Sequence, residues 1–242
     1  ISTPTMILPK GFEVINYYYA VTLVPFFKYF FNSVIIEIIA LSSGMVFNFI
    51  YGYALARLKA PGKTVIFLMI LSQMMIPFIA IQIPQYILFS NLGFRDTYWI
   101  YLVNGVAGSA MTVFVYKQYM LSFPKSIEEA AMIDGCGAFK TYFSIMLPNA
   151  KTILLTGLIF SGVWYYNDYY LNTMFADKHS TLTVALSHLS MAIGEFVSLS
   201  DQQLIMIRVQ AGCLLVILPP MLIYFFVQKK FTEGIERSGI VG

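Results

Sequence analysis

Few side chains in this sequence have the types and spacing that catalysis needs. The two histidines, His179 and His188, stand nine residues apart with no carboxylate–nucleophile set beside them, and Cys136 and Cys213 lack the spacing of metal ligands. No Gly-x-x-x-x-Gly-Lys-Ser/Thr loop is present to hold a phosphate. We therefore predict no catalytic residue, no metal site and no cofactor on this chain, with the histidines as solvated loop residues and the cysteines as small packing residues.

A short polar loop has the most informative spacing in the chain. Glu129-Ala130-Ala131 is followed by Asp134-Gly135 and, after nine more residues, by Ile145-Met146-Leu147-Pro148. Ser126 and Glu129 have the spacing of a capping box, which predicts the start of a short helix after Pro124.

A second helix is predicted from Ala138 to Leu147, after a reversal of the backbone at Gly135 and Gly137 and before Pro148. Its large apolar side chains are predicted to lie on one stripe: Phe139, Tyr142, Phe143 and Met146. The loop, residues 122–150, is thus predicted to be a helix–turn–helix that suits docking into a partner's groove. An ordinary amphipathic loop at the membrane interface is the alternative.

The composition places this loop in a membrane protein. Of 242 residues, 58% are hydrophobic, 17% are aromatic and 11% are charged, and the mean hydropathy is +0.72. Soluble domains carry about 25% charged residues. A soluble fold of this length could not bury so much apolar surface, so the lipid bilayer is predicted to be its solvent.

Five apolar segments approach the ~20 residues that cross a bilayer as a helix. They are Phe31–Ala56, Thr64–Phe89, Tyr98–Leu121, Lys151–Asn172 and Gln203–Val227. Each is too long for a strand, so the fold class is all-α and polytopic, with five transmembrane helices. Pro77 and Pro84 interrupt the second segment and Pro219-Pro220 the fifth, and the expected kinks could serve either packing or gating.

Lysine and arginine predict the orientation of these helices. Ten of the 15 lie on one side, in the connection 57–63, in and around the loop 122–150, and in the tail 229–242. The positive-inside rule places the loop and the C-terminus in the cytoplasm. The net charge of +3 is then a matter of topology, and we expect no nucleic-acid partner.

Five helices would leave the N-terminus outside, yet residues 1–30 contain no signal peptide and the sequence begins at Ile1. We expect a further helix ahead of residue 1, which gives six helices and both ends inside. Residues 1–30 are then an external segment, residues 31–228 the transmembrane domain, and residues 229–242 a cytoplasmic tail.

The spacing of the loop resembles the cytoplasmic coupling loop of permease subunits in ATP-binding-cassette (ABC) importers. From about Phe30 to the end, the chain is similar to the carbohydrate-uptake, maltose-transporter-like group of these permeases. Four further segments carry the resemblance: Phe30-Phe31-Asn32-Ser33, Ala54-Leu55-Ala56-Arg57, Trp164-Tyr165-Tyr166-Asn167-Asp168-Tyr169, and the glycine-ended tail from Phe231. The first helix of that group's six is absent, and Ile235-Glu236-Arg237-Ser238 replaces the smaller residues usual in the tail.

This resemblance implies a type I ABC importer permease, multi-pass in the bacterial plasma membrane, which works by alternating access. It implies a second permease as heterodimer partner, two ATP-binding subunits that hold ATP and Mg, and an extracellular or periplasmic sugar-binding protein. The resemblance implies that the ATPase docks on eight residues of the loop: Glu129, Ala130, Ala131, Asp134, Gly135, Ile145, Leu147 and Pro148. A contact with the ATPase interface is carried over to Gly239, Val241 and Gly242 in the tail.

Polar and aromatic residues in the apolar segments outline a candidate substrate path. They are Asn48, Gln73, Asn104, Trp164, Asn167 and Asp168, with Gln82 in the same set. Amides and carboxylates bind sugar hydroxyls, and aromatic rings offer flat faces. Contact of Asp168 and Glu37 with external water explains these charges equally well, and the tyrosines beside Trp164 also suit a membrane interface.

Three functions are open at this point. The first is import of a carbohydrate, in particular an oligosaccharide. The second is the same architecture with a charged cargo, such as a phosphorylated polyol or a sugar acid. The third is an ion-coupled transporter or channel, which should show inverted repeats and buried charge pairs that the sequence lacks.

Overall fold

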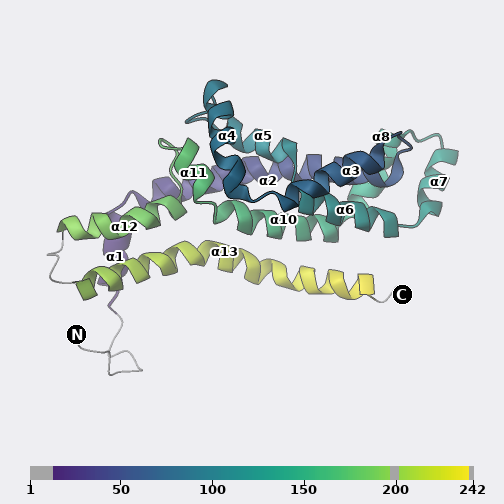
Figure 1. Ribbon diagram of the computed structural model, residues 1–242. Helices are drawn as coiled ribbons and strands as arrows, with labels where there is room; N and C mark the ends of the chain where they lie inside the picture. The colour runs from purple at the N-terminus through teal and green to yellow at the C-terminus, as the bar shows by residue number, and fades with distance from the viewer. Residues whose placement is uncertain (1–12, 197–201, 240–242) are drawn as a thin grey trace.

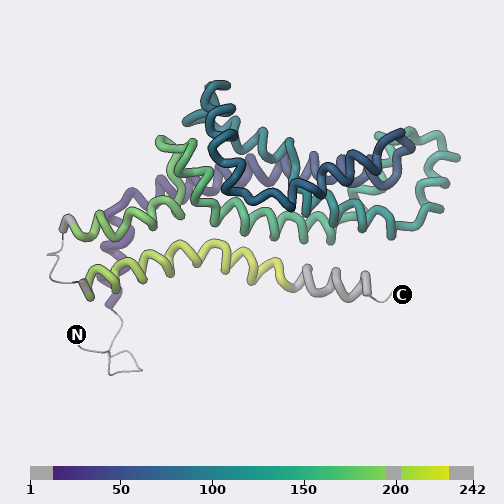
Figure 2. Tube along the Cα trace, in the orientation of Figure 1, coloured from purple at the N-terminus to yellow at the C-terminus, as the bar shows by residue number. Residues whose placement is uncertain are grey.

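The chain is helical throughout the part that the structure describes. The computed structural model describes the backbone of residues 13–196 and 202–239 and the side chains of residues 13–194 and 203–228. Figure 1 shows that most helices lie along one long axis, with α7 and α8 at one end and α1 and α12 at the other. The Cα trace in Figure 2 follows the same path. The predicted all-α class is confirmed for these residues.

The helices before the polar loop are α1 (Ile15–Thr22), α2 (Phe26–Arg57), α3 (Lys63–Ser72) with the 3-10 turn Gln73–Met75, α4 (Phe78–Asn91), α5 (Trp99–Ala107) and α6 (Ala110–Ser122). The loop contains α7 (Lys125–Ile133), α8 (Ala138–Thr141), the π-helical turn Tyr142–Met146 and α9 (Leu147–Asn149). After the loop come α10 (Lys151–Tyr166), α11 (Tyr170–Phe175), α12 (Leu182–Phe196) and α13 (Gln202–Gly239).

Small residues allow α2 to pack closely against α5 and α6. A Cβ atom at Gly105 of α5 would lie 2.9 Å from the backbone nitrogen of Gly44 in α2. A Cβ atom at Gly52 of α2 would lie 2.8 Å from Tyr116 Cβ in α6. Because α10 and α12 also contact α2, this helix is the centre of the bundle.

Two apolar clusters lie along α2. The first contains Ile36, Ala40, Phe89, Ile100, Tyr101, Leu171, Phe175 and Ala176. The second contains Phe49, Tyr53, Tyr116, Met120, Tyr142, Met146, Ala150 and Leu154. Since the second cluster includes residues of the polar loop, it ties that loop to α2, α6 and α10.

The number of helices that could cross a membrane agrees with the prediction, but their shapes differ. By length and composition, Phe26–Arg57 and Gln203–Gln228 could each cross as one helix. Counting each of three bent helix pairs as one crossing raises the number to five among the described residues. Two bends lie in the second and third predicted segments, and the third lies at Ala150, between the loop helices and α10.

The second predicted helix, Thr64–Phe89, is broken at Pro77 by a bend of 105° between α3 and α4. Ile76 is extended, with ψ 120°, because the residue before a proline disfavours the helical conformation. The interruption expected at Pro77 is confirmed. Pro84, Pro219 and Pro220 lie inside helices that continue past them.

The prediction of one helix over Tyr98–Leu121 is wrong. Gly108 and Ser109 separate α5 from α6, which differ in direction by 42°. Gly108 has φ +85°, a conformation that side chains with a Cβ rarely adopt. Asn48 Oδ1 accepts a hydrogen bond from the freed Ser109 N–H at 2.7 Å, so a side chain of α2 stabilises the break.

The prediction of one helix over Lys151–Asn172 is also wrong, because α10 ends at Tyr166. Asp168 Oδ1 accepts a hydrogen bond from the Leu171 N–H at 3.1 Å and so helps to start α11. Short polar side chains compete in this way with continued helix.

Two helices lie where none was predicted, and one begins early. α1 lies within residues 1–30, and α12 lies between the fourth and fifth predicted apolar segments. Both carry apolar faces, and Ala20 of α1 is buried with Leu189 and Ile193 of α12. α2 begins at Phe26 rather than Phe31, directly after Pro25.

Candidate functional site

The first helix of the polar loop, α7, begins after Pro124. This proline occupies the N-cap position with no side-chain hydrogen bond, and the chain is already helical at Lys125. The predicted capping box of Ser126 and Glu129 is therefore wrong. Proline has no side-chain oxygen to cap the helix, and Pro124, with ψ 123°, is extended directly ahead of it.

The Glu129-Ala130-Ala131 motif is divided between two faces of α7. Glu129 and Ala130 are exposed, whereas Ala131 is buried. Glu128 is buried beside Ala131, at the three-residue spacing that places two residues on one helix face. Only the first two motif residues are thus open to a partner, and the third packs inward.

The end of α7 is a Schellman turn at Gly135. The Cys136 N–H donates to the Ala131 carbonyl at 2.9 Å, and the Gly135 N–H donates to the Met132 carbonyl at 3.0 Å. Gly135 has φ +76°, so the reversal predicted for this glycine is confirmed. Asp134, the C-cap residue, is exposed beside it.

The second loop helix contains a π-helical turn, so the predicted single stripe is wrong. Tyr142 and Met146 are buried in the cluster with Phe49 and Tyr53, but Phe139 and Phe143 are exposed. Of the remaining motif residues, Leu147 packs at the edge of this cluster, Ile145 is half-buried and Pro148 is exposed. The helix ends at Asn149, one residue after Pro148.

The loop presents an exposed face with both a carboxylate and large apolar side chains. We call this the docking face: Glu129, Ala130, Met132, Ile133 and Phe139. Ile133 is 87% exposed and Phe139 is 82% exposed. Exposed apolar side chains around a polar loop are typical of a surface that another protein or a membrane interface covers.

A buried ion pair that sequence reasoning missed holds α7 against α2. Arg57 Nε lies 3.3 Å from Glu128 Oε1, and both side chains are less than 10% exposed. Burial raises the pKa of the Glu128 carboxyl above its usual value, and the positive charges of Arg57 and Lys125 counteract the shift. The sequence offered one signal for this burial: Glu128 and Ala131 are three residues apart and so lie on the same face of a helix.

The structure does not gather the candidate substrate-path residues into one site. Gln73, Trp164 and Asn167 are exposed, and Asn48 is buried at the α5–α6 break. Asn104 Oδ1 accepts a hydrogen bond from Gln85 Nε2 at 3.3 Å. Among the described residues, no hydrogen bond joins any two of the six predicted residues, and their role as a path stays a prediction.

A small cavity lies between α2, α6 and α10. It is lined by Asn48, Thr112, Tyr116, Ser161 and neighbouring small and apolar residues, and its volume is about 10 Å³. That volume holds about one water molecule. A sugar does not fit into it.

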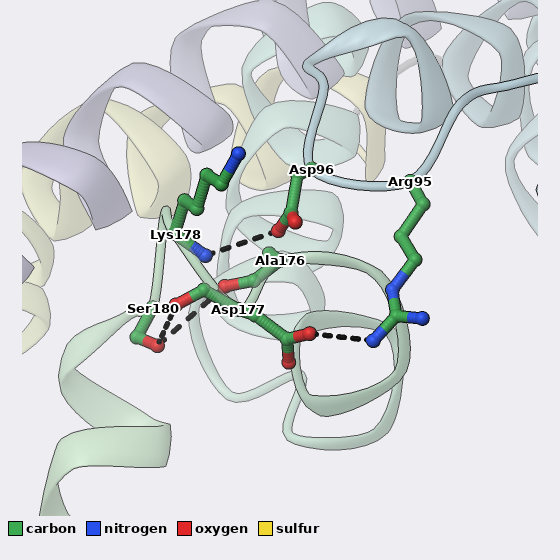
Figure 3. A network of polar contacts seen from close by, with 6 residues as sticks. All are labelled: Arg95, Asp96, Ala176, Asp177, Lys178 and Ser180. Carbon is green, nitrogen blue, oxygen red and sulfur yellow. Dashed lines mark hydrogen bonds and ion pairs between the residues drawn. The ribbon is translucent and has the colours of Figure 1, made fainter.

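The turns at the side of the bundle away from α7 are joined by polar contacts (Figure 3). Arg95 Nη2 donates to Asp177 Oδ2 at 2.8 Å, and the Lys178 N–H donates to Asp96 Oδ1 at 3.0 Å. The Asp96 N–H donates to the Phe175 carbonyl at 2.7 Å. These contacts fasten the connection after α4 to the connection after α11.

The histidines differ from the prediction of solvated loop residues. His179 is half-buried, with Nδ1 3.1 Å from Tyr98 Oη and the two rings 4.5 Å apart. His188 is exposed but lies in α12. The tail prediction falls largely beyond the structure: Gly239 is the last residue of α13, and Val241 and Gly242 lie outside the described residues.

The described residues form a helical bundle with up to five candidate crossings and a polar helix–turn–helix at one end, which is the architecture of a membrane protein. The chain belongs to the family described as the binding-protein-dependent transport system inner membrane component, whose match covers residues 48–236. The resemblance to an ABC importer permease is thereby confirmed.

Two relatives and one solved structure support this assignment. The chain is 30% identical to the probable starch degradation products transport system permease protein AmyC of Thermoanaerobacterium thermosulfurigenes, over 98% of this chain and 84% of AmyC. It is 31% identical to the melibiose/raffinose/stachyose import permease protein MelC of Bacillus subtilis, over 88% of this chain and 75% of MelC. The fold matches a chain in the crystal structure of a bacterial ABC transporter involved in the import of the acidic polysaccharide alginate, with TM-score 0.75, 21% identity, and coverage of 93% of this chain and 81% of that chain.

Proposed function

We propose that this permease imports an oligosaccharide, and that it does so as one of two membrane subunits moved by two separate ATP-binding subunits. The docking face is the observation that carries the mechanism. It offers the Glu129 carboxylate, the small Ala130 side chain and exposed apolar groups on a helix that a Schellman turn holds in shape. The names of the relatives, which specify starch degradation products and melibiose, raffinose and stachyose, support the cargo.

In this proposal the ATPase subunits bind ATP and Mg, and this chain binds neither. Closure of the ATPase dimer around nucleotide moves the docked loop, and the transmembrane helices rock to alternate access. A second permease and an external sugar-binding protein complete the importer. The tail that ends at Gly242 contributes to the ATPase interface.

The orientation follows from charge and from the shape of the bundle. The C-terminal end of α2, the start of α3 and the loop lie at one end of the molecule, and α13 runs toward the same end (Figure 1). Lys59, Lys63, Lys125 and Lys140 belong to that end. By the positive-inside rule, these charges support a cytoplasmic docking face and C-terminus, with Arg95 and Asp177 outside.

The docking role is tested by reversing the charge of Glu129. The Glu129→Lys chain is purified with its partner permease, and the retained ATPase subunit and the ATP turnover are measured. Both should fall, while membrane insertion should not change. Asp177→Lys makes the same charge change at the other end and should retain the ATPase. Normal sugar-stimulated turnover in the Glu129→Lys complex would refute the docking role.

The cargo is tested by ATP turnover in the reconstituted importer with its binding protein. Maltodextrins, arabino-oligosaccharides and raffinose form the panel. Stimulation by at least one of these neutral sugars is expected. Stimulation by a uronic-acid oligomer alone would refute a neutral cargo and leave the docking mechanism in place.

A further inference from the structure

One guanidinium joins three elements where the loop meets the bundle. Arg57 is the last residue of α2, and its Nε pairs with Glu128 of α7 at 3.3 Å. Its Nη2 also donates a hydrogen bond to the carbonyl of Phe123, the C-cap residue of α6. Arg57 therefore fixes the end of α2, the end of α6 and the first turns of α7 relative to one another.

The two loop helices are attached to the bundle by different means. The second helix is held by packing, because the Tyr142 ring lies 5.5 Å from the Phe49 ring and 5.4 Å from the Tyr53 ring. α7 offers only Glu128 and Ala131 as buried residues. Among the residues whose side chains the structure describes, Arg57–Glu128 is the one ion pair between α7 and another helix.

A buried ion pair of this kind is more informative about position than about stability. Removing two charges from water is costly, and their attraction offsets this cost only when the geometry is excellent and hydrogen bonds satisfy both groups. Arg57 Nε and Glu128 Oε1 form an ion pair without a hydrogen bond, so the pair is not expected to add much stability. Apolar residues of similar size would hold α7 as firmly. An ion pair does differ from apolar contact in fixing one register between two helices, since each charge must stay opposite the other.

We propose that Arg57 and Glu128 are positioning residues that transmit displacement of the docked α7 to the central helix α2. Glu129 contacts the partner, and its neighbour Glu128, whose side chain is buried against the bundle, carries the movement into it. α2 contacts α5, α6, α10 and α12, so motion at its end reaches these four helices directly. The proposal rests on the docking of α7 to an ATPase subunit.

The experiment measures the relative motion of α7 and α2 in the whole complex. Spin labels are placed through Ser126→Cys in α7 and Lys59→Cys, two residues beyond the end of α2, both at exposed positions, in a background with Cys136→Ser and Cys213→Ser. Distances are recorded without nucleotide and with ATP and vanadate. With Arg57 and Glu128 intact, the distance distribution should be the same in both states. In Glu128→Gln it should broaden or shift when vanadate traps the nucleotide.

Transport provides the second measurement. ATP hydrolysed per sugar transported should rise roughly 2- to 30-fold in Glu128→Gln, the range expected for one residue of a coupling network. The exchange Arg57→Glu with Glu128→Arg should recover part of the loss. Asp177→Asn, which breaks the exposed ion pair at the other end, should change neither measurement.

The double substitution Arg57→Met with Glu128→Leu guards against simple misfolding, because it removes both buried charges together. It should fold, retain the ATPase and still be uncoupled. An unaltered ratio of ATP to sugar in this variant, or a distance shift in the chain with both residues intact, would overturn the proposal. Loss of ATPase retention in the unsubstituted chain would instead overturn the docking function itself.

Discussion

The turn at Gly135 gives the sharpest quantitative test of the docking face. A Cβ atom built on Gly135 meets nothing within 4 Å, so Gly135→Ala adds no clash. Its cost comes from the backbone alone, because φ is +76°. Placing a residue with a Cβ in the left-handed region costs roughly 1–2 kcal/mol.

Gly137 is a matched control two residues away. A Cβ atom at Gly137 also meets nothing within 4 Å, but its φ is −73°, which any residue adopts. Both substitutions remove a glycine from the same loop, so the effect of each on the unfolded chain is the same and cancels in the comparison. The difference between the two variants isolates the Schellman turn.

The assay is a binding titration of the ATPase subunit against the permease complex in lipid discs. If the free loop relaxes away from the turn, Gly135→Ala weakens binding by up to about 5- to 30-fold relative to Gly137→Ala. Gly135→Asn should weaken binding less, because asparagine tolerates the left-handed region. Equal affinities for Gly135→Ala and Gly137→Ala would refute the idea that this turn shapes the docking face.

Three further predictions concern the bundle, each read as the melting temperature of the purified complex. Gly105→Ala should destabilise the complex by about 1–3 kcal/mol, because the new Cβ lies 2.9 Å from the Gly44 backbone nitrogen. Gly194→Ala, where a Cβ atom has open space, should not lower the melting temperature. Asn48→Leu leaves the Ser109 N–H unpaired and should lower the stability of the complex by about 1–3 kcal/mol. Weaker sugar binding at an unchanged melting temperature would instead indicate that Asn48 contacts the substrate. Arg95→Gln breaks an ion pair whose side chains are more than half exposed and should give no measurable change.

The sequence was sufficient where local chemistry decides the structure. Long apolar segments predicted the helices of the bundle, since lipid leaves the backbone few other solutions. The break at Pro77 and the reversal at Gly135 follow from the φ angles that proline and glycine adopt. The loop was predicted because its polar residues and glycines have a fixed spacing between two apolar segments.

The sequence was insufficient where partners distant along the chain decide the structure. Glu128 and Glu129 are identical neighbours, and one is buried only because Arg57 reaches it from the end of α2. The break at Gly108 is stabilised by Asn48, 61 residues from Ser109 in the chain. α12 was missed because its apolar face is covered by α1 and α13, which no local pattern predicts.

Several polar residues of the predicted substrate path are already engaged in hydrogen bonds within the fold. Asn48 binds the Ser109 N–H, Asn167 Nδ2 donates to the Val163 carbonyl and Asp168 accepts from the Leu171 N–H, so these polar groups already satisfy the backbone at helix breaks and ends. Buried polar groups in lipid need such partners whether or not a sugar passes nearby. Gln73, in contrast, is exposed at the bend between α3 and α4, and no hydrogen bond within the described residues occupies its amide. If sugar specificity resides in this chain, Gln73→Ala should alter it while leaving the melting temperature unchanged. Asn48→Ala, at the buried helix break, should instead lower the melting temperature without changing the specificity.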